Sequence, residues 1–257
     1  MVATRSVSAI VAGDDDGVLG RVARSGVWLI LAHIATAGAA FVVSVVVARR
    51  LGTAEFGRYS FFFFLVSVIP TLVALGIPPS IARTLPERIG AGDHAGAFAV
   101  FRYAIRRHAW FLPPAVVGAA VVSFRSDSSW LPAVVVCGAT VGVLLGLDYE
   151  ALLTALRRFR SLAFISFGTA VAQVVAIGLG ALADVGWRGF LALQTAALVG
   201  GAIPVAVLGL RAMATTPKVP ASPENRRTFK VYARQQAFRL VLTTVLWGRP
   251  ELLFLEA

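Results

Sequence analysis

Six apolar runs, each close to the length of a membrane-spanning helix, limit this chain to very few folds. They are separated by short polar connections and cover residues 26–48, 59–77, 104–124, 130–153, 161–183 and 189–210. A spanning helix needs about 20 apolar residues, whereas a spanning strand has about ten residues of alternating polarity. Stretches such as 42–47 and 61–64 are apolar throughout. The chain is therefore predicted to be an all-α integral membrane protein with a six-helix lobe over residues 26–210.

The composition agrees with a membrane protein and argues against other classes. Of the 257 residues, 58% are hydrophobic and 14% are charged, against about half and a quarter in soluble domains. A disordered chain or a soluble enzyme is therefore not expected. The net charge of +11 can indicate nucleic-acid binding, but the basic residues lie between the apolar runs. Membrane lipids, and no nucleic acid, are the predicted partners.

Nothing in the sequence indicates catalysis or a bound cofactor. Cys137 is the single cysteine, which excludes an internal disulfide and a cysteine-rich metal site. The motifs of P-loop nucleotide sites, zinc proteases and serine hydrolases do not occur. We therefore expect no enzyme activity, no cofactor and no metal.

The distribution of Lys and Arg predicts the orientation. Residues 1–25 form a polar tail, and if this tail is cytoplasmic, the inside segments carry 16 basic residues and the outside loops carry five. Basic residues concentrate on the cytoplasmic side of membrane proteins. We predict a multi-pass protein of the cytoplasmic membrane with its N-terminus inside.

A linker and a seventh run follow the six-helix lobe. Residues 211–230 contain Pro217, Pro220 and Pro223 and are predicted to form an extended cytoplasmic linker. The seventh run begins at residue 231 and is still apolar at Leu255. We expect residues 231–257 to be an incomplete seventh spanning helix, and the chain to be a fragment that needs a C-terminal lobe from the same chain or a partner.

The seventh run carries the strongest candidates for a binding site. At about 100° per residue, Arg234, Gln235, Arg239 and Arg249 lie within one arc of about 140°. An arginine near the bilayer centre costs about 2.5–3.5 kcal/mol on insertion scales, so a protein-lined or water-filled cavity is the predicted environment. Guanidinium groups bind phosphate or carboxylate bidentately. The alternative is that Arg234 and Arg249 extend to the two membrane interfaces.

The fourth run combines a packing stripe with a carboxylate. Gly138, Gly142 and Gly146 recur every four residues, a spacing that lets helices approach closely. Glu150 continues the same stripe and is a candidate for ion or proton coupling, or else a carboxylate at the cytoplasmic interface. Asp148 lies near the same end of the run.

Two further polar residues lie within apolar runs. His33 is a candidate proton relay, and its alternative role is hydrogen-bonded packing. Gln173 is a candidate for contact with a hydroxyl-rich substrate, and its alternative role is an interhelical hydrogen bond.

The loop after the first run resembles a known signature. Residues 48–60 read ARRLGTAEFGRYS, which is similar to the A-R-x-L-G-P-x-x-F-G-x-Y loop of the polysaccharide (O-antigen type) flippases, with Thr53 in place of proline. This family belongs to the multidrug/oligosaccharidyl-lipid/polysaccharide exporter superfamily. The basic stretch 156–160, and the polar segment with Arg83 after the second run, are also similar.

The resemblance implies a MATE-like transporter of two six-helix lobes around a central cavity. It implies that a lipid-linked oligosaccharide crosses the membrane by alternating access, driven by an ion or proton gradient, and that Arg49 lines the outer mouth. The alternatives are a multidrug or cation antiporter of the same superfamily and a non-transporting membrane scaffold. A membrane glycosyltransferase, ligase or polymerase is disfavoured because the outside loops are short.

Overall fold

The computed structural model describes residues 15–214, 216–217 and 219–246, and every regular element in these ranges is a helix. The helices are α2 (Asp15–Val73), α3 (Ile77–Gly90), α4 (His94–Ser126), α5 (Trp130–Ala155), α6 (Phe159–Leu182), α7 (Trp187–Ala214) and α8 (Pro223–Leu246). The predicted all-α class is confirmed for the described part of the chain.

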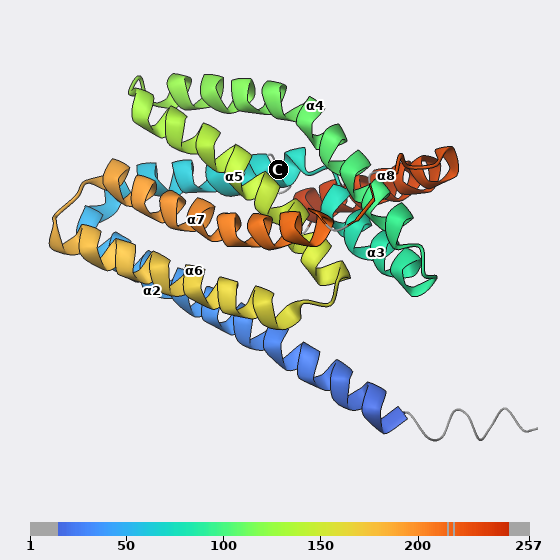
Figure 1. Cartoon of the computed structure of the whole chain (residues 1–257). Coiled ribbons are helices and arrows are strands. Elements are labelled where there is room, and N and C mark those ends of the chain that lie inside the picture. Colours follow the sequence, from blue (N-terminus) through green and yellow to red (C-terminus); the bar gives the residue numbers. More distant parts are fainter. Residues whose placement is uncertain (1–14, 215, 218, 247–257) are drawn as a thin grey trace, which may run out of the picture.

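Helix α2 contains two of the predicted crossings. Its apolar part, Gly26–Val73, has 48 residues and would be about 72 Å long if straight, more than twice the hydrocarbon thickness. Gly52 interrupts it with φ 68° and ψ 177°, a conformation that essentially only glycine adopts. Figure 1 shows the blue part of α2 running to one end of the molecule and the cyan part returning. Gly52, within the loop motif, is therefore the turn between two crossings.

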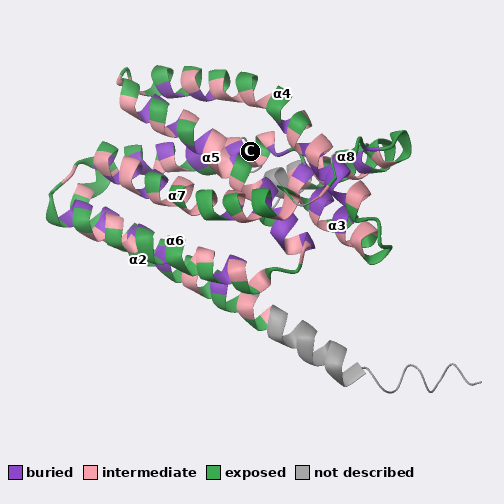
Figure 2. Cartoon of the chain, in the orientation of Figure 1, coloured by how far each residue is buried: buried purple, intermediate pink, exposed green. Residues whose placement is uncertain are grey.

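Five described helices are long and apolar enough to cross a membrane: Gly26–Val73, His94–Ser126, Trp130–Ala155, Phe159–Leu182 and Trp187–Ala214. With the turn at Gly52, they correspond to the six predicted runs. The second run was predicted to reach residue 77, but its helix ends at Val73, and the fifth extends one residue beyond α6. Only 11–33% of the residues in their most apolar windows are buried, and Figure 2 shows exposed residues along the outside of α4 and α6. In water such a surface would be unfavourable, so these faces are suited to lipid.

The helix ends gather at two opposite ends of the molecule. Figure 1 shows the α4–α5 and α6–α7 loops and the turn within α2 at one end, and α3, α8 and the α5–α6 loop at the other. We call these the outer end and the inner end, following the predicted orientation. This arrangement is the one expected for helices that cross a bilayer in alternating directions.

Each end has its own apolar core. At the inner end, Ile77, Ile81 and Leu85 of α3 are buried together with Phe101 of α4 and Phe229 of α8. The i, i+4, i+8 spacing places the three α3 side chains on one helix face. The amphipathic segment after the second run therefore buries its apolar face against protein. The outer core joins both halves of α2 to α4, α5, α6 and α7.

The glycine stripe of α5 faces α7 over part of its length. A Cβ on Gly142 would lie 2.7 Å from Val199 Cγ1, and one on Gly146 would lie 3.0 Å from Ala202 Cβ. A Cβ on Gly138 would meet nothing within 4 Å. The close approach of α5 and α7 therefore depends on Gly142 and Gly146 and leaves Gly138 outside the contact.

The connection before α8 is shorter than the predicted linker over residues 211–230. Helix α7 continues to Ala214, and α8 already begins at Pro223. Proline is well tolerated in the first turn of a helix, where its missing N–H would have no partner within the helix. Helix α8 is not among the spanning candidates. The predicted seventh span reaches into residues 247–257, outside the described part, and stays a prediction.

Candidate functional site

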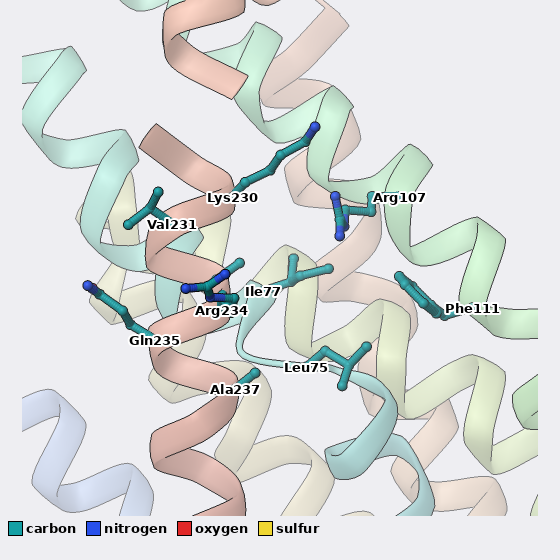
Figure 3. A pocket seen from close by; sticks show the side chains of 10 residues that line it. Leu75, Ile77, Arg107, Phe111, Lys230, Val231, Arg234, Gln235 and Ala237 are labelled. Carbon is teal, nitrogen blue, oxygen red and sulfur yellow. The ribbon is translucent and has the colours of Figure 1, made fainter. Parts of the chain in front are cut away.

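A basic pocket lies at the inner end, between α4, α8 and the junction of α2 and α3. It has a volume of about 430 Å³ and is lined by Leu75, Ile77, Arg107, Phe111, Lys230, Val231, Ala233, Arg234, Gln235 and Ala237. We call it the α8 pocket. Figure 3 shows Lys230 reaching from α8 towards Arg107 on α4, with Arg234 one turn further along α8. Two of the four residues predicted for a cavity in the seventh run, Arg234 and Gln235, are among the residues that line this pocket.

The pocket exists because the backbone of α8 approaches the α2–α3 junction closely. Gly76 has φ 71° and precedes α3. A Cβ at this position would collide with the backbone of Ala233, Gln236 and Ala237. Phe229 is 1% exposed and anchors the start of α8 in the inner core. Arg83 lies with its guanidinium carbon 4.3 Å from the centre of the Tyr232 ring, which adds a cation–π contact between α3 and α8.

The charge of the α8 pocket is uniformly positive. Its lining includes Arg107, Lys230 and Arg234 and no carboxylate. Among the described residues, none of these three cations forms an ion pair within 4.0 Å. Like charges this close repel one another, so an anion in the pocket would lower the electrostatic energy. The pocket is therefore chemically suited to a phosphate or carboxylate group.

The other residues predicted to bind substrate do not line the α8 pocket in the described part of the chain. Arg239 is exposed on α8 and does not line this pocket, and Arg249 lies outside the described residues. Arg49 is exposed near the turn of α2, at the outer end. Gln173 is buried in α6 and does not line the α8 pocket. The structure thus separates these residues from Arg234 and Gln235.

His33 and Glu150, the two candidates for ion or proton coupling, come within electrostatic reach of each other. His33 lies on the first half of α2 and Glu150 on α5, and the two side chains interact Coulombically. Both residues are exposed on the surface of the described lobe. A histidine next to a carboxylate within spanning helices is a suitable pair for proton exchange.

A buried histidine–carboxylate pair that sequence reasoning missed connects α4, α5 and the turn after α2. His108 Nδ1 on α4 lies 2.6 Å from Asp148 Oδ2 on α5, and both side chains are at most 4% exposed. His108 Nε2 lies 3.0 Å from the carbonyl oxygen of Ala74, at the end of α2. Asp148 Oδ1 is buried without a hydrogen-bond partner among the described residues. The only sequence signal was one ionisable residue near the end of each of two separate apolar runs.

The outer end carries an exposed ion pair between the α4–α5 loop and α7. Arg188 Nη2 donates to both carboxylate oxygens of Asp127, at 3.1 and 2.9 Å. The backbone N–H of Ser129 also donates to Asp127 Oδ1. The Ser129 hydrogen bond, followed by Arg188, lowers the pKa of Asp127 below its ordinary value. Because Arg188 is about half exposed, this pair contributes little to stability.

A polar contact also joins the second half of α2 to α7. The Tyr59 hydroxyl donates to Gln194 Oε1 in the protein interior. Phe62 stacks on Trp187 next to it, with ring centroids 5.3 Å apart. Tyr59 is the last residue of the loop motif, so this motif residue contributes to the contact between α2 and α7.

No group of three or more His, Cys, Asp or Glu that could hold a metal occurs among the described residues. The candidate chemistry of the lobe therefore rests on cations for an anionic ligand and on two histidine–carboxylate pairs. The α8 pocket is the site where predicted residues and a cavity coincide.

Comparison with known proteins identifies a family for the first part of the chain. Residues 22–91 match the family model described as polysaccharide biosynthesis protein. The matched segment contains the loop motif, most of α2 and α3, and the pocket residues Leu75 and Ile77. No curated protein and no solved structure matched the chain. Over residues 22–91 the chain is therefore similar to polysaccharide biosynthesis proteins, as the loop motif indicated, and its long apolar helices are those of a multi-pass membrane protein.

Proposed function

We propose that the chain forms the N-terminal lobe of a flippase that carries a lipid-linked oligosaccharide across the cytoplasmic membrane by alternating access. The lobe is proposed to have a MATE-like arrangement, with its N-terminus and inner end on the cytoplasmic side. The missing C-terminal lobe would come from the same chain or a partner. The observation that carries this proposal is the α8 pocket, in which three cations and no carboxylate meet next to the family-matched segment.

The chemistry of the pocket suits a lipid diphosphate. Arg107 and Arg234 provide guanidinium groups, which bind phosphate oxygens bidentately, and Lys230 provides a point charge. The volume of about 430 Å³ falls within the usual range for small-ligand sites, about 300–1,000 Å³. Leu75 and Phe111 supply an apolar wall on the α4 side of the pocket. In this proposal the pocket holds the phosphates while the glycan lies in water and the lipid tail stays in the bilayer.

A proton or ion gradient is the proposed energy source, and His33 with Glu150 is the proposed coupling pair. A change of protonation at either side chain would alter their Coulombic attraction and so the contact between α2 and α5. Helix α2 also leads to Leu75 in the α8 pocket. In this proposal, coupling passes from the first crossing of α2 through the turn at Gly52 and the second crossing to the pocket.

Export of the glycan in cells tests the pocket. Arg234→Ala should lower the amount of lipid-linked glycan exposed on the outer face at least tenfold at equal protein level, since a charge-assisted hydrogen bond to phosphate contributes about 1.5–3 kcal/mol. Arg234→Lys should restore part of the export. Arg227→Ala, on the same helix and exposed outside the pocket, should have little effect. Equal export by Arg234→Ala and Arg227→Ala would refute a role for the pocket.

A second candidate function is a cation-coupled antiporter of the same superfamily. The buried pair of His108 and Asp148 favours it, because an ionisable pair inside a spanning bundle is a typical ion pathway element. Transport of an organic cation that is lost in Asp148→Asn, together with unchanged glycan export, would favour this alternative.

A further inference from the structure

A second basic pocket lies at the inner end, between α4 and the connection to α8. It has a volume of about 510 Å³, and its lining includes Arg102, Tyr103, Arg106, Val219, Ala221 and Arg226. It shares no lining residue with the α8 pocket. Arg106 lines the second pocket and its neighbour Arg107 lines the α8 pocket, because successive residues of a helix point about 100° apart. The two sites are therefore separate, and we call the second one the linker pocket.

Two of the three arginines of the linker pocket are held in place by backbone carbonyls of the connection before α8. Arg102 Nη2 donates to the carbonyl oxygens of Pro217 and Val219, at 3.1 and 3.3 Å. Arg226 Nε donates to the carbonyl oxygen of Ala221 at 2.9 Å. These contacts join α4, the connection and α8 into one preformed site, which reduces the ordering that binding would require.

Tyr103 completes the site from the α4 side. The guanidinium carbon of Arg226 lies 5.7 Å from the centre of the Tyr103 ring. The same ring packs edge-on against Phe229 of the inner core, with centroids 6.2 Å apart. The position of Arg226 is therefore fixed by a cation–π contact as well as by its hydrogen bond.

The linker pocket concentrates positive charge without a compensating acid. Its lining contains no carboxylate, and within the described part of the chain Arg102, Arg106 and Arg226 form no ion pair within 4.0 Å. Arg102 and Arg106 are one helical turn apart on the same face of α4. Three guanidinium groups around one cavity offer many N–H donors in forks that match phosphate oxygens.

The pocket lies at the level of a membrane interface. Helix α4 has 33 residues, so it is about 50 Å long and exceeds the hydrocarbon core of about 30 Å. The apolar run within it begins near residue 104, which places Arg102 and Arg106 at the boundary between the apolar and polar parts. Phosphate groups of anionic lipids lie at this level, and the cytoplasmic leaflet attracts basic segments.

We propose that the linker pocket binds a phosphate group, and that an anionic phospholipid headgroup is its ligand. The bound headgroup would bridge α4, residues 219–221 and the first turn of α8, and so would fix the position of α8 relative to the lobe. A soluble phosphate compound has the same binding chemistry and is the other source of ligand. This site does not depend on the proposed transport function.

Lipid retention and thermal stability of the purified protein in mild detergent test the proposal. We expect the protein to retain phosphatidylglycerol in preference to phosphatidylcholine of equal chain length, measured by native mass spectrometry. Arg106→Gln should weaken phosphatidylglycerol binding about fivefold, the effect of one basic residue near an anionic surface. Arg106 is the test residue because, unlike Arg102 and Arg226, it makes no hydrogen bond to the described backbone of the connection. Its loss should leave the fold intact.

A control variant and a soluble phosphate distinguish a lipid site from a site for soluble phosphate and from no specific site. Arg227→Gln removes one positive charge from α8, next to the pocket residue Arg226, but Arg227 lies outside the pocket. This variant should bind phosphatidylglycerol like the unchanged protein. If inorganic phosphate raises the Tm as much as phosphatidylglycerol does, and Arg106→Gln abolishes both increases, the ligand is a soluble phosphate. If Arg106→Gln and Arg227→Gln behave alike with both ligands, the proposal is wrong. Unchanged glycan export in Arg106→Gln would show that this site is independent of the α8 pocket.

Discussion

At the scale of single residues, His108 and Asp148 form the most demanding interaction in the lobe. Taking an ionisable pair out of water is costly, and the cost is recovered only when the partners are well placed. Their 2.6 Å contact and the second contact of His108 with the Ala74 carbonyl meet this condition. Because Ala74 directly follows α2 and lies two residues before Gly76, the pair connects the fold of the lobe to the position where α8 docks.

Removing His108 should therefore destabilise the protein strongly. His108→Leu leaves Asp148 buried without its partner, and breaking a buried pair costs about 3–5 kcal/mol. His94→Leu, at the exposed start of α4, should change stability by less than about 0.5 kcal/mol. Thermal unfolding in detergent measures both variants. Similar Tm values for the two would contradict the importance of the pair.

Gly76 tests the close approach of α8. Gly76→Ala places a Cβ against the α8 backbone and also strains a residue with φ 71°. Gly92 has φ 80° and open space around it, so Gly92→Ala carries the conformational strain alone, about 1–2 kcal/mol. Gly76→Ala should lower the Tm clearly more than Gly92→Ala does. An equal loss in the two variants would mean that α8 does not approach Gly76 closely.

At the scale of elements, α8 is the helix on which the candidate site depends. It contributes Lys230, Arg234 and Gln235 to the α8 pocket, and Arg226 to the linker pocket. It is held by few contacts, chiefly with α3 and α4. Small changes at its anchoring residues should therefore affect the site more than changes within the five spanning helices.

Two phenylalanines of α8 provide a matched test of this anchoring. Phe229 is 1% exposed and Phe238 is 67% exposed. Phe229→Ala should destabilise the protein by about 3–5 kcal/mol, the usual cost for a buried phenylalanine, and Phe238→Ala by less than about 1 kcal/mol. Denaturant unfolding followed by tryptophan fluorescence gives both values. A larger effect at Phe238 would mean that the opposite face of α8 is anchored.

At the scale of the whole molecule, the two ends of the lobe differ in chemistry. The inner end contains both basic pockets, whereas the outer end contains the exposed Asp127–Arg188 pair. This asymmetry agrees with the bias of Lys and Arg along the sequence. It predicts that the α8 pocket opens from the cytoplasmic side, where a lipid-linked precursor would be loaded.

Cysteine labelling tests this orientation. Cys137→Ala removes the only native cysteine, and single cysteines can then be placed at Ser128 in the α4–α5 loop or at Arg227 on α8, both exposed. A membrane-impermeant maleimide added to intact cells should label Ser128→Cys and spare Arg227→Cys. The reverse pattern would invert the topology and contradict loading from the cytoplasm.

The apolar runs predicted most of the fold because a helix that faces lipid must be apolar along its length, and such a run is visible in the sequence. The six runs agree with the spanning helices, and Gly52 within the loop motif marks the turn in α2. The start of α8 was misplaced because three prolines indicated an extended segment, while Pro223 in fact begins a helix. The position of Arg239 outside the α8 pocket was also not predictable, since a helical wheel gives angles but not the neighbours of each face.

The long-range contacts were beyond the reach of the sequence pattern. His108 and Asp148 are 40 residues apart, and neither belongs to a motif. The approach of α8 to Gly76 and the grouping of Arg107 with Arg234 depend on how separate helices dock. Such pairings depend on packing and desolvation between helices, and these do not produce a repeating pattern in the sequence.

Translocation in reconstituted vesicles is the most direct measurement of the proposed function. The protein, together with the proposed second lobe, would be placed in vesicles whose inner or outer leaflet carries a lipid-diphosphate oligosaccharide, and the glycan would be detected with an impermeant lectin. We predict that the protein makes glycan from the opposite leaflet accessible at a rate well above protein-free vesicles, and that Arg234→Ala loses most of this rate. A rate equal to that of protein-free vesicles would contradict a flippase function for this lobe.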